Sequence, residues 1–107
     1  MASSLADPTA RVRSLNDNLR RHRIGGLILY TPGVLALGLE LLVLVDEAIK
    51  NFDEFTPDNY PYGEHDFGTV RVEGHTVAFK IDYYDKDRAG HSPDPADPSV
   101  TCRIMTI

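Results

Sequence analysis

An almost uncharged apolar run from Ile24 to Val45 places the strongest constraint on how this chain folds. The run holds 22 residues with a single charge, Glu40, and it follows a group of arginines. Its length and basic flank suit a membrane-spanning helix, but a Thr-Pro-Gly turn at 31–33 divides it into two short pieces. Membrane insertion is therefore not favoured, and we expect a short buried strand followed by a buried helix.

The composition fits one globular domain over residues 1–107. The chain is 42% hydrophobic and 25% charged, which argues against wholesale disorder and a coiled coil. A length of 107 residues leaves room for one self-sustaining core. We expect residues 1–6 to form a disordered end and the Pro/Asp-rich stretch 85–98 to be a loop. The single cysteine, Cys102, permits no intrachain disulfide, which favours a reducing, cytoplasmic location.

Charge is distributed unevenly along the chain. Residues 1–24 carry five Arg against two Asp, a net of +3, whereas residues 46–107 carry six basic and thirteen acidic groups, a net of −7. The acidic part is a poor phosphate binder, so nucleic-acid binding is not favoured and would have to use the N-terminal arginines. These are Arg11, Arg13, Arg20, Arg21 and Arg23.

The N-terminal third predicts a helix and a short strand. An Asp-Pro pair at 7–8 is typical of a helix start, because Asp caps the first turn and Pro has no N–H to leave unpaired. The expected helix covers 8–22, with Arg13, Arg20 and Arg21 on its outer side. The apolar residues 27–30 predict a short buried strand.

A second helix is predicted over 37–52. Its apolar positions follow helical spacing, but further leucines and a valine make it apolar almost all round. Such a helix is buried on more than one side, either by its own domain or by a second chain. A homodimer through helix 37–52 is therefore one interpretation.

The region that follows predicts a β-hairpin with strands at about 67–73 and 76–84. A turn at Gly74-His75 produces one apolar and one mostly polar face, as a half-buried antiparallel pair requires. The expected pairs on the apolar face are Val72 with Val77, Val70 with Phe79, and Gly68 with Ile81.

The C-terminal residues fit two structures. An Asp-Pro pair at 97–98 resembles a helix start, but β-branched residues favour a last strand over 100–106. We therefore predict a small α+β domain in which the hairpin and strands 27–30 and 100–106 form an antiparallel sheet. Helices 8–22 and 37–52 would pack against that sheet.

The hairpin register brings two acidic segments, 63–68 and 80–85, to one end of the sheet. It places Asp66 near Tyr83, His65 near Tyr84, and Glu64 near Asp85. We predict a polar binding site there from seven residues: Glu64, His65, Asp66, Asp82, Tyr83, Tyr84 and Asp85.

Neighbouring carboxylates repel one another, which leaves three arrangements open. In the first, Lys80, Arg71 or Arg88 neutralises the carboxylates. In the second, the carboxylates point apart into water, and in the third they bind a divalent metal ion. The candidate metal ligands are Glu64, His65, Asp66, Asp82 and Asp85. A bound metal would polarise a water for hydrolysis, with His65, Asp66 and Asp82 as candidate catalytic residues. No other cofactor is expected, and the weak motifs favour a protein that is not an enzyme.

The chain also contains several long and unusual segments. They are RVRSLNDNLR (11–20), the Gly-Gly-strand-Thr-x-Gly-Val segment (25–34), FDEFTPDNYPYGEHDFG (52–68), KIDYYD (80–85) and SPDPADPSVTCRIMTI (92–107). Together they resemble the bacterial family catalogued as domain of unknown function 3768. The resemblance implies a short protein often encoded on plasmids and other mobile elements, and it supplies no activity. The nearly uncharged helix at 37–52 departs from the amphipathic helix usual in that family.

Three functional hypotheses follow. The leading one is a non-enzymatic accessory or interaction factor of a bacterial mobile element, with blocking of a host defence as one such role. Its acidic half or its apolar helix would contact an unknown protein partner. The alternatives are a metal-dependent hydrolase or nuclease at the Glu64/His65/Asp66 and Asp82/Asp85 cluster, and nucleic-acid binding through the N-terminal arginines.

Overall fold

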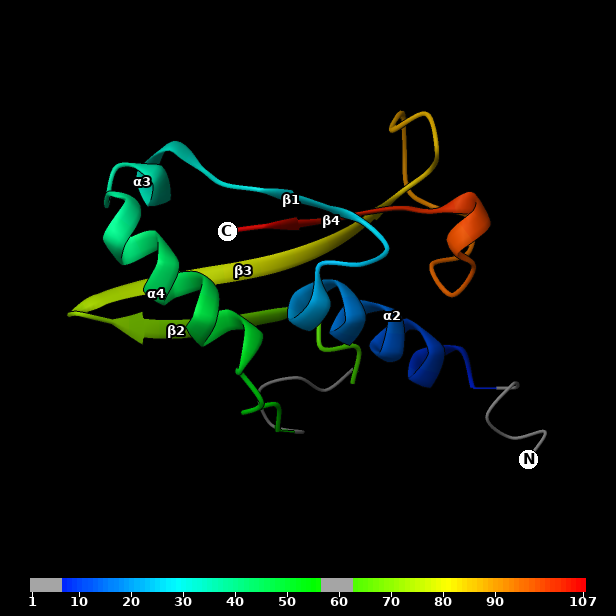
Figure 1. Ribbon diagram of the computed structural model, residues 1–107. Coiled ribbons are helices and arrows are strands. Elements are labelled where there is room, and N and C mark those ends of the chain that lie inside the picture. The colour runs from blue at the N-terminus through cyan, green and yellow to red at the C-terminus, as the bar shows by residue number, and fades with distance from the viewer. Residues whose placement is uncertain (1–6, 57–62) are drawn as a thin grey trace.

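The computed structural model describes residues 7–56 and 63–107, which form a helical layer over a four-stranded sheet (Figure 1). This confirms the predicted α+β fold, while the expected disordered end at 1–6 lies outside the described residues. The elements in chain order are α2 (Pro8–His22), β1 (Leu27–Leu29), α3 (Pro32–Leu35), α4 (Leu39–Lys50), β2 (Phe67–Val72), β3 (His75–Tyr84), the 3₁₀ helix η1 (Pro98–Val100) and β4 (Cys102–Thr106).

The sheet has the strand order β1-β4-β3-β2 and is mixed. β2–β3 and β3–β4 are antiparallel, but β1 pairs with β4 in parallel, with Leu27 opposite Ile104. The prediction of a wholly antiparallel sheet was therefore wrong in this detail. A short apolar run indicates a strand, but it does not specify which strand it joins or in which direction. The predicted burial of this strand was also wrong, because Leu27 and Leu29 are 42% and 50% exposed at the edge of the sheet.

The β2–β3 hairpin turns one residue earlier than predicted. Val72 pairs with His75, and Val70 pairs with Val77, so the predicted register was wrong by two residues. The turn residues are Glu73 and Gly74, both with positive φ (50° and 83°), as a two-residue type I′ turn requires. Because the shift is an even number of residues, every side chain stays on its predicted face.

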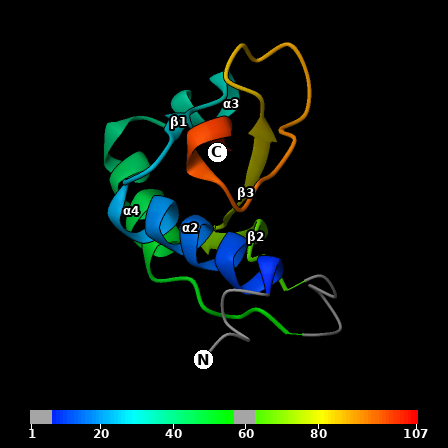
Figure 2. The same ribbon diagram turned by 90° about the vertical axis from the view of Figure 1, so that its right-hand side faces the viewer.

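α2 and α4 lie on the same side of the sheet, as the two views show (Figures 1 and 2). Their inner faces pack against side chains that alternate along the strands, including Phe79, Ile81 and Met105. In α2 the matching apolar residues are Val12 and Leu19, which lie about two helical turns apart on the face that the 3.6-residue period correctly assigned to the core. The opposite face of the sheet has no described helix over it.

α4 begins at Leu39 rather than 37, because Gly38 has a φ of 94° and separates it from the short helix α3. It buries Val45 and Ile49 and leaves Leu39, Val43 and Leu44 exposed. Burial of this helix on several sides by its own domain was therefore a wrong prediction. None of the helices in residues 7–56 and 63–107 is long and apolar enough to span a membrane.

The C-terminal segment combines both structures that its sequence suggested. Asp97 caps the single turn of η1 by accepting from the N–H of Ser99 (2.9 Å). The chain then enters β4, which confirms a strand rather than a helix for Cys102–Thr106. No described helix or strand lies within residues 85–97, and Pro98, the last residue of the predicted loop 85–98, is the first residue of η1.

Candidate functional site

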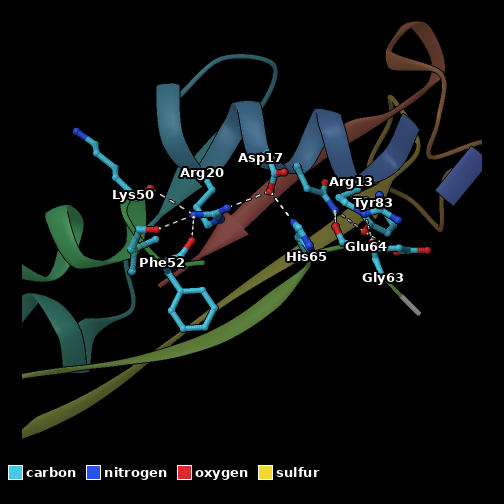
Figure 3. Close-up of polar contacts among 11 residues, drawn as sticks. Arg13, Asp17, Arg20, Lys50, Phe52, Gly63, Glu64, His65 and Tyr83 are labelled. Carbon is cyan, nitrogen blue, oxygen red and sulfur yellow. Dashed lines mark hydrogen bonds and ion pairs between the residues drawn. The ribbon is translucent and has the colours of Figure 1, made fainter. Parts of the chain in front are cut away.

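The two acidic segments lie side by side at the end of the hairpin, as predicted. The N–H of Ile81 donates to the carbonyl of Asp66 (2.8 Å), so the chain before β2 continues alongside β3. The Tyr83 hydroxyl donates to the Glu64 carboxylate (2.7 Å). The corrected register therefore places Glu64, rather than Asp66, beside Tyr83 (Figure 3).

The candidate side chains nevertheless point in different directions. His65 Nδ1 lies 3.0 Å from Asp17 on α2, and its ring stacks on Phe55 with centroids 3.9 Å apart. Asp82 forms an ion pair with Lys80 (3.3 Å), on the sheet face opposite Tyr83.

Two further candidates, Tyr84 and Asp85, also point away from the others. The carboxylate of Asp85 accepts from the N–H of Ala89 (2.9 Å) within its own loop, and Tyr84 is exposed on the open face of the sheet. In the part of the chain that the structure describes, no group of three or more His, Cys, Asp or Glu side chains is arranged to hold a metal ion.

Asp66 is the candidate carboxylate with the most unfavourable surroundings. Partial burial raises its pKa above the ordinary value of 3.8, although a hydrogen bond with its own backbone opposes this rise. The nearby carboxylates of Glu64 and Asp82 raise the pKa further. Ionised Asp66 therefore costs the folded state free energy.

Asp66→Asn is expected to stabilise the protein at neutral pH. An acid whose pKa is raised by folding favours the folded state at low pH, and that contribution is lost as pH rises above about 3.8 through the folded-state pKa. The gain in urea midpoint should therefore be present at pH 7 and disappear near pH 3. Asp87→Asn, at an exposed position in the 85–98 loop, is the control. An equal gain in both variants would contradict this interpretation.

A buried polar network adjoins this position, centred on Asn16 of α2. The Asn16 amide nitrogen donates to the Tyr83 hydroxyl (2.8 Å) and to the Glu64 carbonyl (3.0 Å). Its oxygen accepts from Arg103 Nε of β4 (2.7 Å). Arg103 also donates to the carbonyl of Pro95 and lies over the ring of Tyr83. One amide thus joins four segments that are distant in sequence.

The buried groups of this network keep their ordinary protonation. Burial raises the pKa of the Tyr83 phenol, and its hydrogen bond to Glu64 raises it further. Burial lowers the pKa of the Arg103 guanidinium, but an arginine stays charged at neutral pH. Tyr83 is therefore a hydrogen-bond donor to Glu64 rather than an acid poised to react near pH 7.

A second network runs from His65 through Asp17 to Arg20 (Figure 3). Arg20 is fully buried, so the prediction that it points outward was wrong. Its guanidinium donates to Asp17 (3.0 Å) and to the carbonyls of Ile49, Lys50 and Phe52 (3.0, 3.3 and 2.7 Å). These carbonyls lie at the C-terminal end of α4, where unpaired backbone acceptors and the negative end of the helix dipole attract a cation.

The other arginines of the proposed nucleic-acid surface mostly contact the chain itself. Arg13 Nε donates to the carbonyl of Gly63 (2.5 Å), and Arg11 Nε donates to that of Ala96 (3.3 Å). Arg23 forms an ion pair with Asp46 (3.2 Å). Of these five arginines, Arg21 has an exposed side chain for which the described structure shows no hydrogen bond or ion pair. The cluster therefore does not form a free basic patch.

Sequence reasoning missed Asn16, Asp17 and Arg103 as members of these networks. One signal was available for Asn16, because it lies on the apolar stripe of α2 between Val12 and Leu19, at i and i+7. A polar residue on a buried stripe requires hydrogen-bond partners. No comparable pattern marks Arg103. Apolar residues of β4 lie on both faces of the sheet, so the alternation does not show that Arg103 is on a buried face.

Comparison with known proteins gives one match. A family model described as a protein of unknown function (DUF3768) matches residues 30–107, which include the α4, β2, β3 and β4 contributions to the networks. No curated protein and no solved structure matches the chain.

Proposed function

The chain belongs to the DUF3768 family of proteins of unknown function, and we propose that it is a non-enzymatic factor that binds another protein. The observation that carries this proposal is the exposed apolar face of α4. Leu39 is 76% exposed, Val43 59% and Leu44 46%. Three large apolar side chains on neighbouring turns of one helix are typical of a surface that another chain covers.

The charges beside this face favour a basic partner. Glu40 and Glu47 lie seven residues apart on the exposed side of α4, and the chain from 46 to 107 carries a net charge of −7. Two copies packed antiparallel through α4 would bring Glu40 of each copy toward Glu47 of the other, which repel. An amphipathic segment with Lys or Arg beside its apolar residues would instead complement this face. The alternative to a basic partner at this face is a second copy of the chain, in a homodimer through α4.

The cellular setting is the finer part of the proposal. The family resemblance supports an accessory factor of a bacterial mobile element, and blocking a host defence protein is one role that such a partner-binding factor would serve. The lone Cys102 supports the reducing cytoplasm as its location. A metal-dependent hydrolase at residues 64–66 and 82–85 and nucleic-acid binding by the arginines have less support, because internal contacts occupy most of those side chains.

We expect Leu39→Ser/Val43→Ser to abolish capture of a specific partner from the native host without affecting folding. Both side chains are mostly solvated, so the change in stability should stay within about 1 kcal/mol. Leu29→Ser, at a half-exposed position on β1, is the matched control. Tagged wild-type protein and both variants are compared in a pull-down, and the captured protein is then tested with the purified chain at low and high salt.

Two results would contradict this proposal. If the double variant captures the same protein as the wild type, the α4 face is not the binding surface. If sedimentation shows a wild-type dimer and a monomeric double variant, a second copy covers that face.

A further inference from the structure

β2 forms one edge of the sheet, so one side of its backbone has no neighbouring strand. The order β1-β4-β3-β2 places β3 between β2 and the rest of the sheet, and Figure 1 shows β2 outermost. Among the described residues, no other strand pairs with the outer side of β2. At a rise of ~3.4 Å per residue, Phe67–Val72 spans about 20 Å. This is room for an extended segment of similar length.

The outward backbone groups of β2 belong to its odd-numbered residues. The N–H of Ile81 donates to the carbonyl of Asp66, just before β2 (2.8 Å). Because pairing alternates along antiparallel strands, even-numbered residues such as Val70 exchange hydrogen bonds with β3. The N–H and C=O groups of Thr69 and Arg71 therefore point away from β3, and the described structure shows no hydrogen bond to them. These groups are available to another strand.

A groove of about 440 Å³ lies beside the same edge. Residues 69–71 line it from β2, and residues 51–54, which follow α4, line it from the other side. Phe52 and Val70 contribute apolar surface to this lining, and the exposed Asp53 and Glu54 contribute two carboxylates. The groove thus combines unpaired strand backbone with an apolar wall and acidic side chains, an arrangement that suits an extended peptide.

The two carboxylates of the groove have no cation bound to them in the described part of the chain. Neither Asp53 nor Glu54 forms an ion pair there. Arg20 interacts with Asp53 through its charge alone, because its donors go to other acceptors inside the protein. Arg71 also lines the groove, but it donates to the hydroxyl of Thr76 (3.0 Å). The groove therefore favours a ligand that brings positive charge.

The geometry of a sheet decides where that charge would lie. Side chains of an added strand alternate between the two faces of the sheet. In an antiparallel pairing, the residue opposite Thr69 has its side chain on the open face, where a second threonine suits it. The residues before and after it face the side that α4 covers. A Lys or Arg there would lay its aliphatic stem on Val70 and Phe52 and bring its charge to the carboxylates of the groove.

We propose that the outer edge of β2 binds an extended segment of a partner protein with Lys or Arg at alternate positions, which adds to the sheet as an antiparallel strand. A second copy of the chain suits this edge less well, because two joined β2 edges would gather the Asp53 and Glu54 carboxylates of both copies. The site is separate from the outer face of α4 and goes beyond the proposed function. It stands whether or not that face binds a partner.

The test is an NMR titration with defined pentapeptides. The probe is acetyl-Lys-Thr-Lys-Thr-Lys-amide, and the same peptide with Glu for Lys is the charge control. The Lys peptide should shift the amide signals of Thr69 and Arg71 most and slow their hydrogen exchange. The Val70 amide already bonds to β3, so it should exchange slowly in free and bound protein alike. The Lys peptide should bind about ten-fold more tightly than the Glu peptide, since two exposed ion pairs distinguish them.

Two N-methylated forms of the Lys peptide separate strand pairing from simple charge attraction. Methyl groups on both Thr nitrogens block the donors that face β2, so this peptide should not bind. Methyl groups on two of the Lys nitrogens, which point away from β2, should leave the affinity within about two-fold of the parent peptide. Both peptides keep the same charge, so attraction by charge alone would not distinguish them.

Two pairs of protein variants complete the test. Glu54→Lys should reduce the preference for the Lys peptide to about two-fold, whereas Asp87→Lys makes the same change in net charge in the 85–98 loop and should leave that preference unchanged. Thr69→Pro removes an outward N–H and should abolish binding, with Thr69→Val as the control that keeps it.

Three results would overturn the proposal. The first is that about 5 mM Lys peptide leaves the Thr69 and Arg71 amides unchanged. The second is equal binding of the two N-methylated peptides. The third is a shift of those amides on dilution of the chain alone, because a second copy would then occupy the edge.

Discussion

Replacement of Arg20 by Met is expected to lower the free energy of unfolding by about 3–5 kcal/mol, the range found when one partner of a buried charge network is removed. Arg20 is 0% exposed and its guanidinium contacts acceptors from two helices. Methionine fills part of the volume but donates no hydrogen bond. The carbonyls of Ile49, Lys50 and Phe52 would lose their donor at the end of α4.

The charge of Arg20 matters as well as its hydrogen bonds. Burial lowers the pKa of its guanidinium, but the hydrogen bond and charge of Asp17 oppose this. The rings of Phe55 and Phe79 lie 5.2 and 5.9 Å from the guanidinium carbon, within the range of a cation–π contact. Arg20→Lys should therefore recover part of the loss, because it keeps the charge but not the planar set of donors.

Urea denaturation monitored by circular dichroism measures these effects, with Arg21→Met as the control. Arg21 is the next residue on α2 and is exposed, so its replacement should change the free energy of unfolding by about 0.5 kcal/mol or less. Equal effects of Arg20→Met and Arg21→Met would show that Arg20 does not join α2 to the end of α4.

The hairpin shows which part of the fold was accessible from sequence. Alternation of apolar and polar residues has a period of two, so it correctly assigned Val70, Val77 and Phe79 to one face. It could not fix the register, because a shift of two residues preserves that alternation. The turn decides the register, and here Glu73 adopts a positive φ that is more usual for Gly, Asn or Asp.

Arg20 shows why the site was less accessible. The 3.6-residue period of α2 places Arg20 four residues after Asn16, next to the buried stripe, but a charged residue is normally assigned to solvent. Its acceptors lie about thirty residues further along the chain, at the end of α4. Only the packing of α2 against α4 brings them together, and no local pattern encodes that contact.

The hairpin pattern correctly placed the two acidic segments side by side, but it did not predict the hydrogen-bond and ion-pair partners of their side chains. The sequence suggested that Glu64, His65 and Asp82 face one another, whereas each has a different partner. Two of those partners, Asp17 and Tyr83, contribute to the contacts with α2. Contacts with α2 and β3 therefore hold Glu64 and His65 apart from Asp82, and the predicted common pocket does not form among these three side chains.

Asn16→Ala is expected to destabilise the protein by about 3 kcal/mol, because it leaves several buried groups without a partner. Arg103 Nε would lose its acceptor, and the Glu64 carbonyl would lose a donor. The Tyr83 hydroxyl would keep its bond to Glu64 but lose the Asn16 amide. Asn18→Ala, at an exposed position two residues away on the same helix, should change stability by about 0.5 kcal/mol or less.

Two further variants separate the halves of the Asn16 contact. Asn16→Asp keeps an acceptor for Arg103 but removes the donor to the Glu64 carbonyl and adds a carboxylate near Glu64. In a double-mutant cycle with Arg103→Met, Asn16→Ala should show a coupling of about 1–3 kcal/mol, because the two side chains share one buried hydrogen bond. Additive losses in urea denaturation would mean that α2 and β4 are held together by apolar packing alone. In that case the buried polar residues would not explain why these segments meet.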